Sequence, residues 1–218
     1  CWSQFGIMTY AQVTGRTSLR DIEVGFANKE NYFYHLGLKS VSRSTLADAN
    51  SHRNWHIYEE LFETVLVRCR DLTPKHKFRF KNSLKSFDAT TISLCLKMFP
   101  WAKFRQTKGA IKINTRLDHS GQIPDFVHVT TGKTHEIKVA RTLELEADDI
   151  LVFARAMIDY KWLHQIDEQG AHFVTRAKDN MSYRVLRNPE HQLPMLTGYA
   201  RKQGILKDQI ICIVGHKA

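Results

Sequence analysis

The chain has 218 residues, of which 43% are hydrophobic and 25% charged, a composition typical of a globular protein with one or two domains. No apolar run reaches the ~18–20 residues that a membrane-spanning helix needs, and no charged-then-apolar leader opens the chain. The four cysteines are far apart and form no Cys-x-x-Cys pair, which argues against a disulfide scaffold or a zinc finger and favours a reducing compartment. The chain begins at Cys1 rather than Met, and we expect it to be a fragment.

The formal net charge is +10, from 32 basic and 22 acidic residues. This balance favours a polyanionic partner such as nucleic acid. The excess is concentrated between Arg68 and Arg116, where thirteen Lys or Arg face only Asp71 and Asp88. Two cation clusters lie inside this range and a third follows near residue 180. They are Lys75, Lys77, Arg79 and Lys81; Lys103, Arg105 and Lys108; and Arg176, Lys178, Arg184 and Arg187.

In the first cluster the cations alternate with His76, Phe78 and Phe80. A period of two places the cations on one face of an extended segment and the rings on the other. The segment is then either a surface that follows DNA phosphates or a solvated edge strand whose lysines block aggregation.

The first 72 residues are expected to be a helical region. The apolar pattern predicts helices over 2–13, 18–26, 32–36 and 45–50, and a long one from Asn54 to Cys69. Ser18 and either Ser42 or Ser44 are predicted N-caps. Short helices joined by tight turns are compatible with DNA binding, although helical bundles without that role are more common.

From Leu84 onward the pattern predicts an α/β domain over residues 73–218. Its elements run β-β-β-α-β-α-β, over Leu84–Leu96, Ala110–Leu117, Ile123–Thr130, His135–Leu143, Ile150–Phe153, Asp159–Glu168 and Ala171–Thr175. A meander followed by crossover connections gives a mixed sheet with helices on its faces. A ribonuclease H-like fold has this order, with its first strand central and its fourth parallel beside it.

Asp88 is a carboxylate in the middle of an apolar strand. Charged groups in such places are paired, hold a metal or face solvent. Asp88 is therefore either a Mg²⁺ or Mn²⁺ ligand, an exposed residue on a half-buried strand, or the partner of Lys85 or Lys112.

Several segments in order resemble DDE-type insertion-sequence transposases of the IS-four-like group, whose third catalytic motif is Tyr-Arg-Glu-Lys. They are SLRDIEVG, SRSTLADANSHRNW, SFDATTISLCL, FPWAKFRQTKGAIKI, GKTHEIKVA and FVTRAKDN. The resemblance covers essentially the whole chain. It implies a ribonuclease H-like catalytic domain behind an N-terminal helical DNA-binding region, and Mg²⁺- or Mn²⁺-dependent cutting and joining of DNA at terminal inverted repeats. It also implies a cytoplasmic, nucleoid-associated protein that could work as a homodimer on DNA.

The resemblance makes Asp88 the first catalytic, metal-binding Asp. The second Asp, in a pattern like Asp-Arg-Gly/Ala-Tyr, falls on Ala154, and its Tyr on Met157. Asp159 is the nearest replacement, but it is better placed to cap the next helix; Asp148 and Asp149 precede the strand at its wrong end. The Glu motif is expected beyond residue 218, so that the chain stops within a β-rich insertion.

Other residues match the family less specifically. Arg176 and Lys178 match a stretch expected near DNA, with a structural ion pair from Arg176 to Asp179 or Glu168 as the alternative. His135 and Glu136 match a His-acid pair of undefined role, and a His that begins a helix and packs on the sheet is the alternative.

Three functions follow. The first is a transposase fragment that inherits the catalytic design. The second is a catalytically inactive DNA-binding remnant that occupies transposon ends, which Ala154 favours for this chain. The third is a ribonuclease H-like nuclease acting on other nucleic acids. We expect this chain to be inactive in cleavage.

Overall fold

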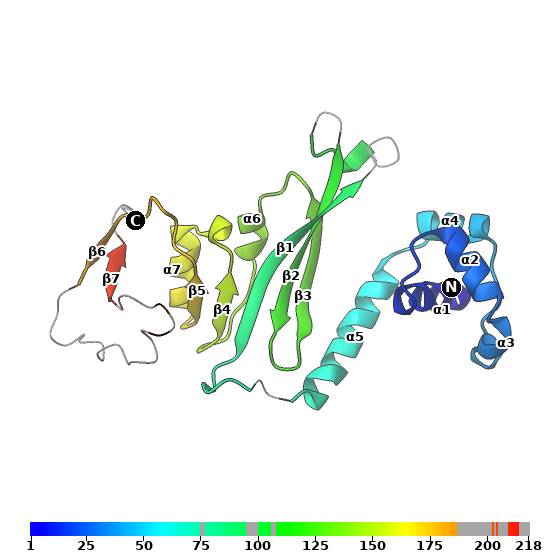
Figure 1. Ribbon diagram of the computed structural model, residues 1–218, viewed down its shortest axis with the longest axis horizontal. Helices are drawn as coiled ribbons and strands as arrows, with labels where there is room; N and C mark the ends of the chain where they lie inside the picture. Colours follow the sequence, from blue (N-terminus) through cyan, green and yellow to red (C-terminus); the bar gives the residue numbers. More distant parts are fainter. Residues whose placement is uncertain are drawn as a thin grey trace. The chain divides into compact units, whose positions relative to one another are not determined.

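The computed structural model describes residues 1–74, 77–94, 100–105, 108–186, 202, 204 and 209–213. The chain divides into two compact units, Cys1–Val67 and Arg68–Ala218, and each is described by itself (Figure 1). In the described part of the chain, no helix has both the length and the apolar character needed to cross a membrane.

The first unit is helical, as the sequence predicts. Its elements are α1 (Trp2–Val13), α2 (Leu19–Ala27), α3 (Glu30–Phe33), a 3₁₀ turn η1 (Tyr34–Leu36), α4 (Arg43–His52) and most of α5 (His56–Leu72). The expected caps are present: the side chains of Ser18 and Ser42 accept hydrogen bonds from the N–H groups of Asp21 and Thr45. A small core joins α1, α2 and α4 through side chains that include Ile7, Tyr10, Phe26 and Leu46.

The second unit contains a five-stranded sheet. Its elements are β1 (Leu84–Leu94), η2 (Pro100–Ala102), β2 (Gly109–Asp118), β3 (Ile123–Thr131), α6 (Glu136–Ala140), β4 (Ile150–Phe153), η3 (Arg155–Met157), α7 (Tyr160–Glu168) and β5 (His172–Thr175). The strand order is β3-β2-β1-β4-β5. β1 pairs antiparallel with β2 and parallel with β4, and β4 pairs parallel with β5.

The expected element order and the central position of the first strand are therefore confirmed. This is a mixed α/β sheet of the kind that a ribonuclease H-like DDE domain has. Helix α6 is shorter than the sequence predicts. A further small sheet joins β6 (Tyr183–Val185), which the sequence did not indicate, to β7 (Ile211–Ile213).

The core of this unit lies on one face of the sheet. Phe87 of β1 and Leu151 and Phe153 of β4 form one buried cluster with side chains of α6 and α7, among them Val139, Trp162 and Ile166. Because successive side chains of a strand point to opposite faces, the residues next to Phe87 and Phe153 lie on the other face of the sheet.

The segment from Lys77 to Lys81 is not a strand. It is a series of bends in which all five side chains are exposed, and the rings of Phe78 and Phe80 stack with centroids 5.4 Å apart. The edge-strand alternative is therefore wrong for the described residues 77–81, which form no strand. Lys75 and His76 lie outside the described residues.

Candidate functional site

The strand pair β1–β4 brings Asp88 and Ala154 to the same edge of the sheet. The last paired residues of these parallel strands are Phe87 and Phe153, and Asp88 and Ala154 follow them directly. Both residues are exposed, on the face opposite the helices. The structure thus places Asp88 beside the position at which the resemblance expects the second carboxylate.

Neither lysine considered as a partner pairs with Asp88. Lys85 Nζ lies 2.6 Å from Asp149 Oδ2, and Lys112 Nζ lies 3.0 Å from Glu136 Oε1. Both lysines point to the face opposite Asp88. Side chains alternate along a strand, so Lys85 lies on the opposite face of β1 from Asp88, and Lys112 of β2 is paired with Thr91, which shares the face of Lys85. No described residue forms an ion pair with Asp88, which leaves its carboxylate open to solvent, a metal ion or a positively charged ligand.

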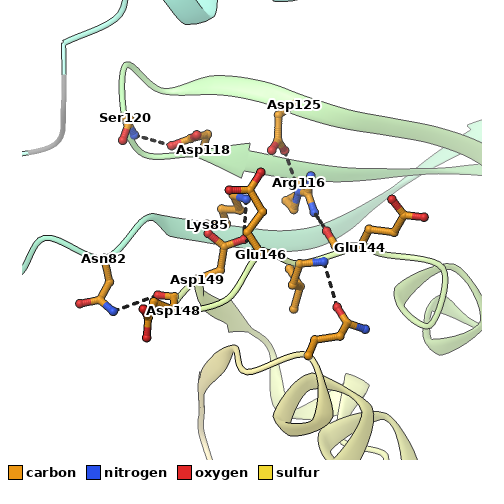
Figure 2. A network of polar contacts seen from close by, with 12 residues as sticks. Asn82, Lys85, Arg116, Asp118, Ser120, Asp125, Glu144, Glu146, Asp148 and Asp149 are labelled. Carbon is orange, nitrogen blue, oxygen red and sulfur yellow. Dashed lines mark hydrogen bonds and ion pairs between the residues drawn. The ribbon is translucent and has the colours of Figure 1, made fainter.

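A buried ion pair holds the starts of β1 and β4 together (Figure 2). The side chains of Lys85 and Asp149 are only 10% and 2% exposed, and Asp149 Oδ2 also accepts the N–H of Glu146 at 2.9 Å. A backbone hydrogen bond also joins the start of β4 to the residue before β1, since Ile150 N donates to Ser83 O at 2.8 Å. This pair lies three residues before Asp88 and helps set the β1–β4 register on which the position of Asp88 depends.

A second buried pair supports the neighbouring strands. Arg116, opposite Phe87 on β2, donates through Nε to Asp125 Oδ1 at 2.8 Å and through Nη1 to Glu144 O at 2.7 Å. Sequence reasoning missed both ion pairs. The available signal was charged residues at inward positions of the strands, but nothing in a single sequence shows which distant partner each would meet.

After Phe153 the chain leaves β4 and enters a basic neighbourhood. Arg155 Nη1 lies 3.1 Å from Asp179 Oδ2, and Lys178 Nζ donates to Ile158 O at 3.1 Å. Arg155, Lys178 and Asp179, together with Ala156 and Asn180, line a shallow hollow of about 370 Å³. Two cations and one carboxylate therefore surround the space next to Ala154.

Asp159 has a structural task. Its Oδ1 accepts the N–H of Trp162 at 3.0 Å, which caps α7, and its Oδ2 lies 2.9 Å from Arg141 Nη2. Partial burial by itself would raise the pKa of this carboxyl, but the hydrogen bonds from Arg141 and Trp162 and the charge of Arg141 outweigh it and lower the pKa below its ordinary value of 3.8. The expected helix cap is confirmed, and both oxygens of Asp159 are engaged.

A divalent ion does not fit these residues. Mg²⁺ requires near-octahedral oxygen ligands and gives up its water reluctantly, yet among the described residues Asp88 is the one carboxylate directly at the end of the paired β1–β4 segment. Ala154 offers a methyl group, and Asp179 is held by Arg155. Within the described ranges, no three His, Cys, Asp or Glu residues gather into a possible metal site.

Backbone hydrogen bonds close the segment that carries the second cation cluster. The backbone N–H groups of Phe104 and Arg105 both donate to Lys108 O, at 2.9 and 3.0 Å, and Lys103 bridges to Gly109 at the start of β2. The guanidinium of Arg105 lies 5.4 Å from the centroid of the Phe104 ring. This turn presents Lys103, Arg105 and Lys108 as exposed cations beside the β1–β2 ribbon.

The third cluster begins where β5 ends. Arg176 is exposed, and neither ion-pair alternative is present, because Asp179 pairs with Arg155 and Glu168 with His164. Lys178 is exposed as well. At the start of α6, His135 is exposed rather than packed on the sheet, while Glu136 pairs with Lys112 across to β2.

Comparison with known proteins matches both units. The model of a family described as a domain of unknown function (DUF4372) matches residues 1–39. The model of the Transposase DDE domain family matches residues 79–210, which include all five strands of the main sheet. No solved structure matches the chain.

Two curated relatives are similar in sequence. A candidate transposase of Sinorhizobium fredii, y4zB, is 28% identical over 148 residues, which cover 68% of this chain and 40% of the relative. A candidate transposase for the insertion sequence element IS5377 of Geobacillus stearothermophilus is 25% identical over 181 residues, which cover 83% of this chain and 46% of the relative. The chain thus spans less than half the length of these relatives. Because the DDE domain model covers more than half of the chain, including the sheet that carries Asp88, this chain belongs to the family of transposases with a DDE domain.

Proposed function

We propose that this chain is a transposase-derived DNA-binding module of the IS-four-like group that occupies insertion-sequence ends and does not itself cut DNA. The observation that carries the proposal is that Asp88 and Ala154 each directly follow the last paired residues of β1 and β4, Phe87 and Phe153. A ribonuclease H-like domain that cleaves by two-metal chemistry needs carboxylates to clamp both ions. One carboxylate beside a methyl group does not supply them.

Exposed cations support binding to duplex DNA. The turn formed by Lys103, Arg105 and Lys108 is closed by backbone hydrogen bonds, so its cations are held within one short segment. Arg176 and Lys178 lie at the end of β5, and Lys77, Arg79 and Lys81 precede β1. Cations of this kind bind phosphates irrespective of sequence and release counterions when they do so.

The proposal assigns the two parts of the chain different tasks. Residues 73–218 carry the inherited catalytic fold and the cation clusters. Residues 1–72 form a helical region that we propose also contacts DNA. Photo-crosslinking of the bound chain to a labelled duplex, followed by mass spectrometry, would test this division; crosslinks confined to residues 73–218 would contradict the assignment of the helical region.

Binding to insertion-sequence ends is the finer part of the proposal. Competition between a duplex bearing the terminal inverted repeat of the element that encodes the chain and a random duplex of equal length measures it directly. We expect preference for the repeat. Equal affinity for both duplexes would favour a general nucleic-acid-binding or nuclease-like module of the same fold.

The absence of cutting is tested separately from binding. A supercoiled plasmid carrying the repeat should stay intact with this chain in Mg²⁺ or Mn²⁺, under conditions in which the repeat duplex is saturated. Cleavage that depends on Asp88 would restore the active-transposase alternative. A ribonuclease H-like nuclease would instead degrade substrates that lack the repeat.

A further inference from the structure

The shallow hollow beside Ala154 holds one carboxylate between two cations. It has a volume of about 370 Å³ and is lined by Arg155, Ala156, Lys178, Asp179 and Asn180; we call it the edge hollow. Arg155 and Lys178 contribute two positive charges and Asp179 contributes one negative charge, so the lining carries a net charge of +1. A surface with this balance attracts anions rather than metal cations.

Each cation of the edge hollow is held by a single contact. Arg155 Nη1 lies 3.1 Å from Asp179 Oδ2, and Lys178 Nζ donates to Ile158 O at 3.1 Å. A guanidinium has five N–H donors and an ammonium has three. Both groups are therefore held in place and still have donors for a further ligand.

The ion pair between Arg155 and Asp179 is open to competition. The side chain of Asp179 is 85% exposed and that of Arg155 is 47% exposed. Pairs as exposed as this one stabilise a protein little, because water and salt screen them. A phosphate accepts the same two parallel N–H donors of a guanidinium that a carboxylate accepts. A phosphate can therefore replace Asp179 at Arg155 at little cost.

The backbone around Asp179 does not depend on this ion pair. Met181 N donates to Lys178 O at 3.0 Å, which closes a turn with Asp179 and Asn180 as its central residues. Thr175 Oγ1 donates to Phe153 O at 2.9 Å and joins the end of β5 to the residue before Ala154. These contacts remain when the carboxylate leaves Arg155, so only one side chain has to move.

We propose that the edge hollow binds a phosphate group through Arg155 and Lys178, and that Asp179 occupies Arg155 in the free chain as an internal competitor of that phosphate. On binding, Arg155 exchanges its ion pair with Asp179 for charge-assisted hydrogen bonds to the phosphate oxygens. Asp179 thus weakens anion binding beside Asp88. Where the phosphate belongs to DNA, the inference rests on the proposed function.

Inorganic phosphate tests the site without DNA. In a chain with nitrogen-15-labelled arginine, the Nε–H resonance of Arg155, identified by its loss in Arg155→Lys, should shift during titration with phosphate at constant ionic strength. Asp179→Asn should lower the phosphate concentration at half-maximal shift by about 2- to 5-fold. Asn is favoured in turns, so this substitution keeps the backbone. An Arg155 resonance that ignores phosphate in both proteins would overturn the proposal.

Duplex DNA tests the same exchange on the proposed ligand. In fluorescence anisotropy at fixed salt, Asp179→Asn should bind a duplex about 2- to 5-fold more tightly than the parent chain. Asp148→Asn is the matched control, because Asp148 is 82% exposed and lies before β4, at the strand's other end. Asn also tolerates the positive φ of Asp148. This control should change the affinity less than Asp179→Asn does.

Two duplexes distinguish the sources of the phosphate. One has 5′-hydroxyl ends, and the other is the same duplex with 5′-phosphate ends. An equal gain from Asp179→Asn on both duplexes identifies a backbone phosphate as the ligand. A gain confined to the second duplex identifies a terminal phosphate.

A double variant separates competition at Arg155 from the general loss of a negative charge. In Arg155→Ala, adding Asp179→Asn should no longer tighten binding, because the carboxylate then has no guanidinium to occupy. A gain that persists in Arg155→Ala, or that equals the gain from Asp148→Asn, would overturn the exchange. Weaker phosphate binding by Asp179→Asn would show that the ion pair supports the site, which also overturns it. A chain that binds phosphate at Arg155 but no duplex would contradict the proposed function and leave the phosphate site standing.

Discussion

Asp88 and Ala154 each follow directly on Phe87 and Phe153, the last paired residues of the parallel strands β1 and β4. The backbone therefore brings these two positions together at one edge of the sheet. Asp88 carries a carboxylate there, whereas Ala154, where the resemblance expects a second carboxylate, carries a methyl group. Because the strand pairing is present but Ala154 has no carboxylate, a substitution at Ala154 tests catalytic capacity directly.

Restoring the second carboxylate alone should not restore cutting. Ala154→Asp creates a two-carboxylate edge and should tighten Mn²⁺ binding, measured by electron paramagnetic resonance of the free ion. We expect no nicking of an end-bearing duplex in Mn²⁺ by either protein, because Mg²⁺ and Mn²⁺ need further fixed ligands and Arg155 and Lys178 lie close by. Nicking by the unmodified chain that Asp88→Ala abolishes would show that another group, such as Asp179, completes the site.

The salt dependence of DNA binding should reveal the contribution of the Lys103–Lys108 turn. Replacing Lys103, Arg105 and Lys108 by Ala should flatten the slope of log K against log[salt] by roughly 0.9 for each phosphate that these cations neutralise. Fluorescence anisotropy with a duplex between low and moderate salt measures this slope. An unchanged slope would mean that this turn does not touch DNA; Lys133→Ala, at an exposed position after β3, serves as a single-charge comparison.

The buried pair between Lys85 and Asp149 should matter for stability. Lys85→Met leaves the Asp149 carboxylate buried without its counter-ion and should lower the free energy of unfolding by about 3–5 kcal/mol. Urea denaturation followed by circular dichroism gives this value. Because the loss comes mainly from the uncompensated charge, the double variant Lys85→Met, Asp149→Leu should be more stable than Lys85→Met alone; an equally unstable double variant would show that the pair itself is the larger contribution.

The cap of α7 should give a pH-dependent contribution to stability. Folding lowers the pKa of Asp159 below 3.8, so the carboxylate stabilises the folded state above that pH and the contribution disappears as the pH falls through the folded-state pKa. Asp159→Ala should cost about 1 kcal/mol at neutral pH. Asp159→Asn keeps a capping side chain and loses the attraction to Arg141. The stability that Asp159→Asn loses relative to the parent chain should therefore become smaller as the pH falls. Thermal unfolding between pH 6 and 3 measures this difference in stability, and a difference that stays constant would contradict the prediction.

The sequence alone predicted the order of the helices and of the five strands of the main sheet, because the signals for these elements are local. Ser18 and Ser42 cap helices because their side chains reach N–H groups three residues away, and the compact apolar run Ile150–Phe153 is a strand with Leu151 and Phe153 buried. The expected parallel pairing of the first and fourth strands followed from the connection rules for such an order, and it brought Asp88 next to Ala154.

Only the tertiary structure decided which charges meet and which apolar surfaces are covered. Lys85 meets Asp149, 64 residues away in the sequence, and periodicity on one strand carries no information about such a partner. Arg116 likewise meets Asp125 on the neighbouring strand and the backbone oxygen of Glu144, 28 residues away. A strand pattern states which face prefers to be buried; the tertiary structure determines which distant groups meet a charged residue on that face.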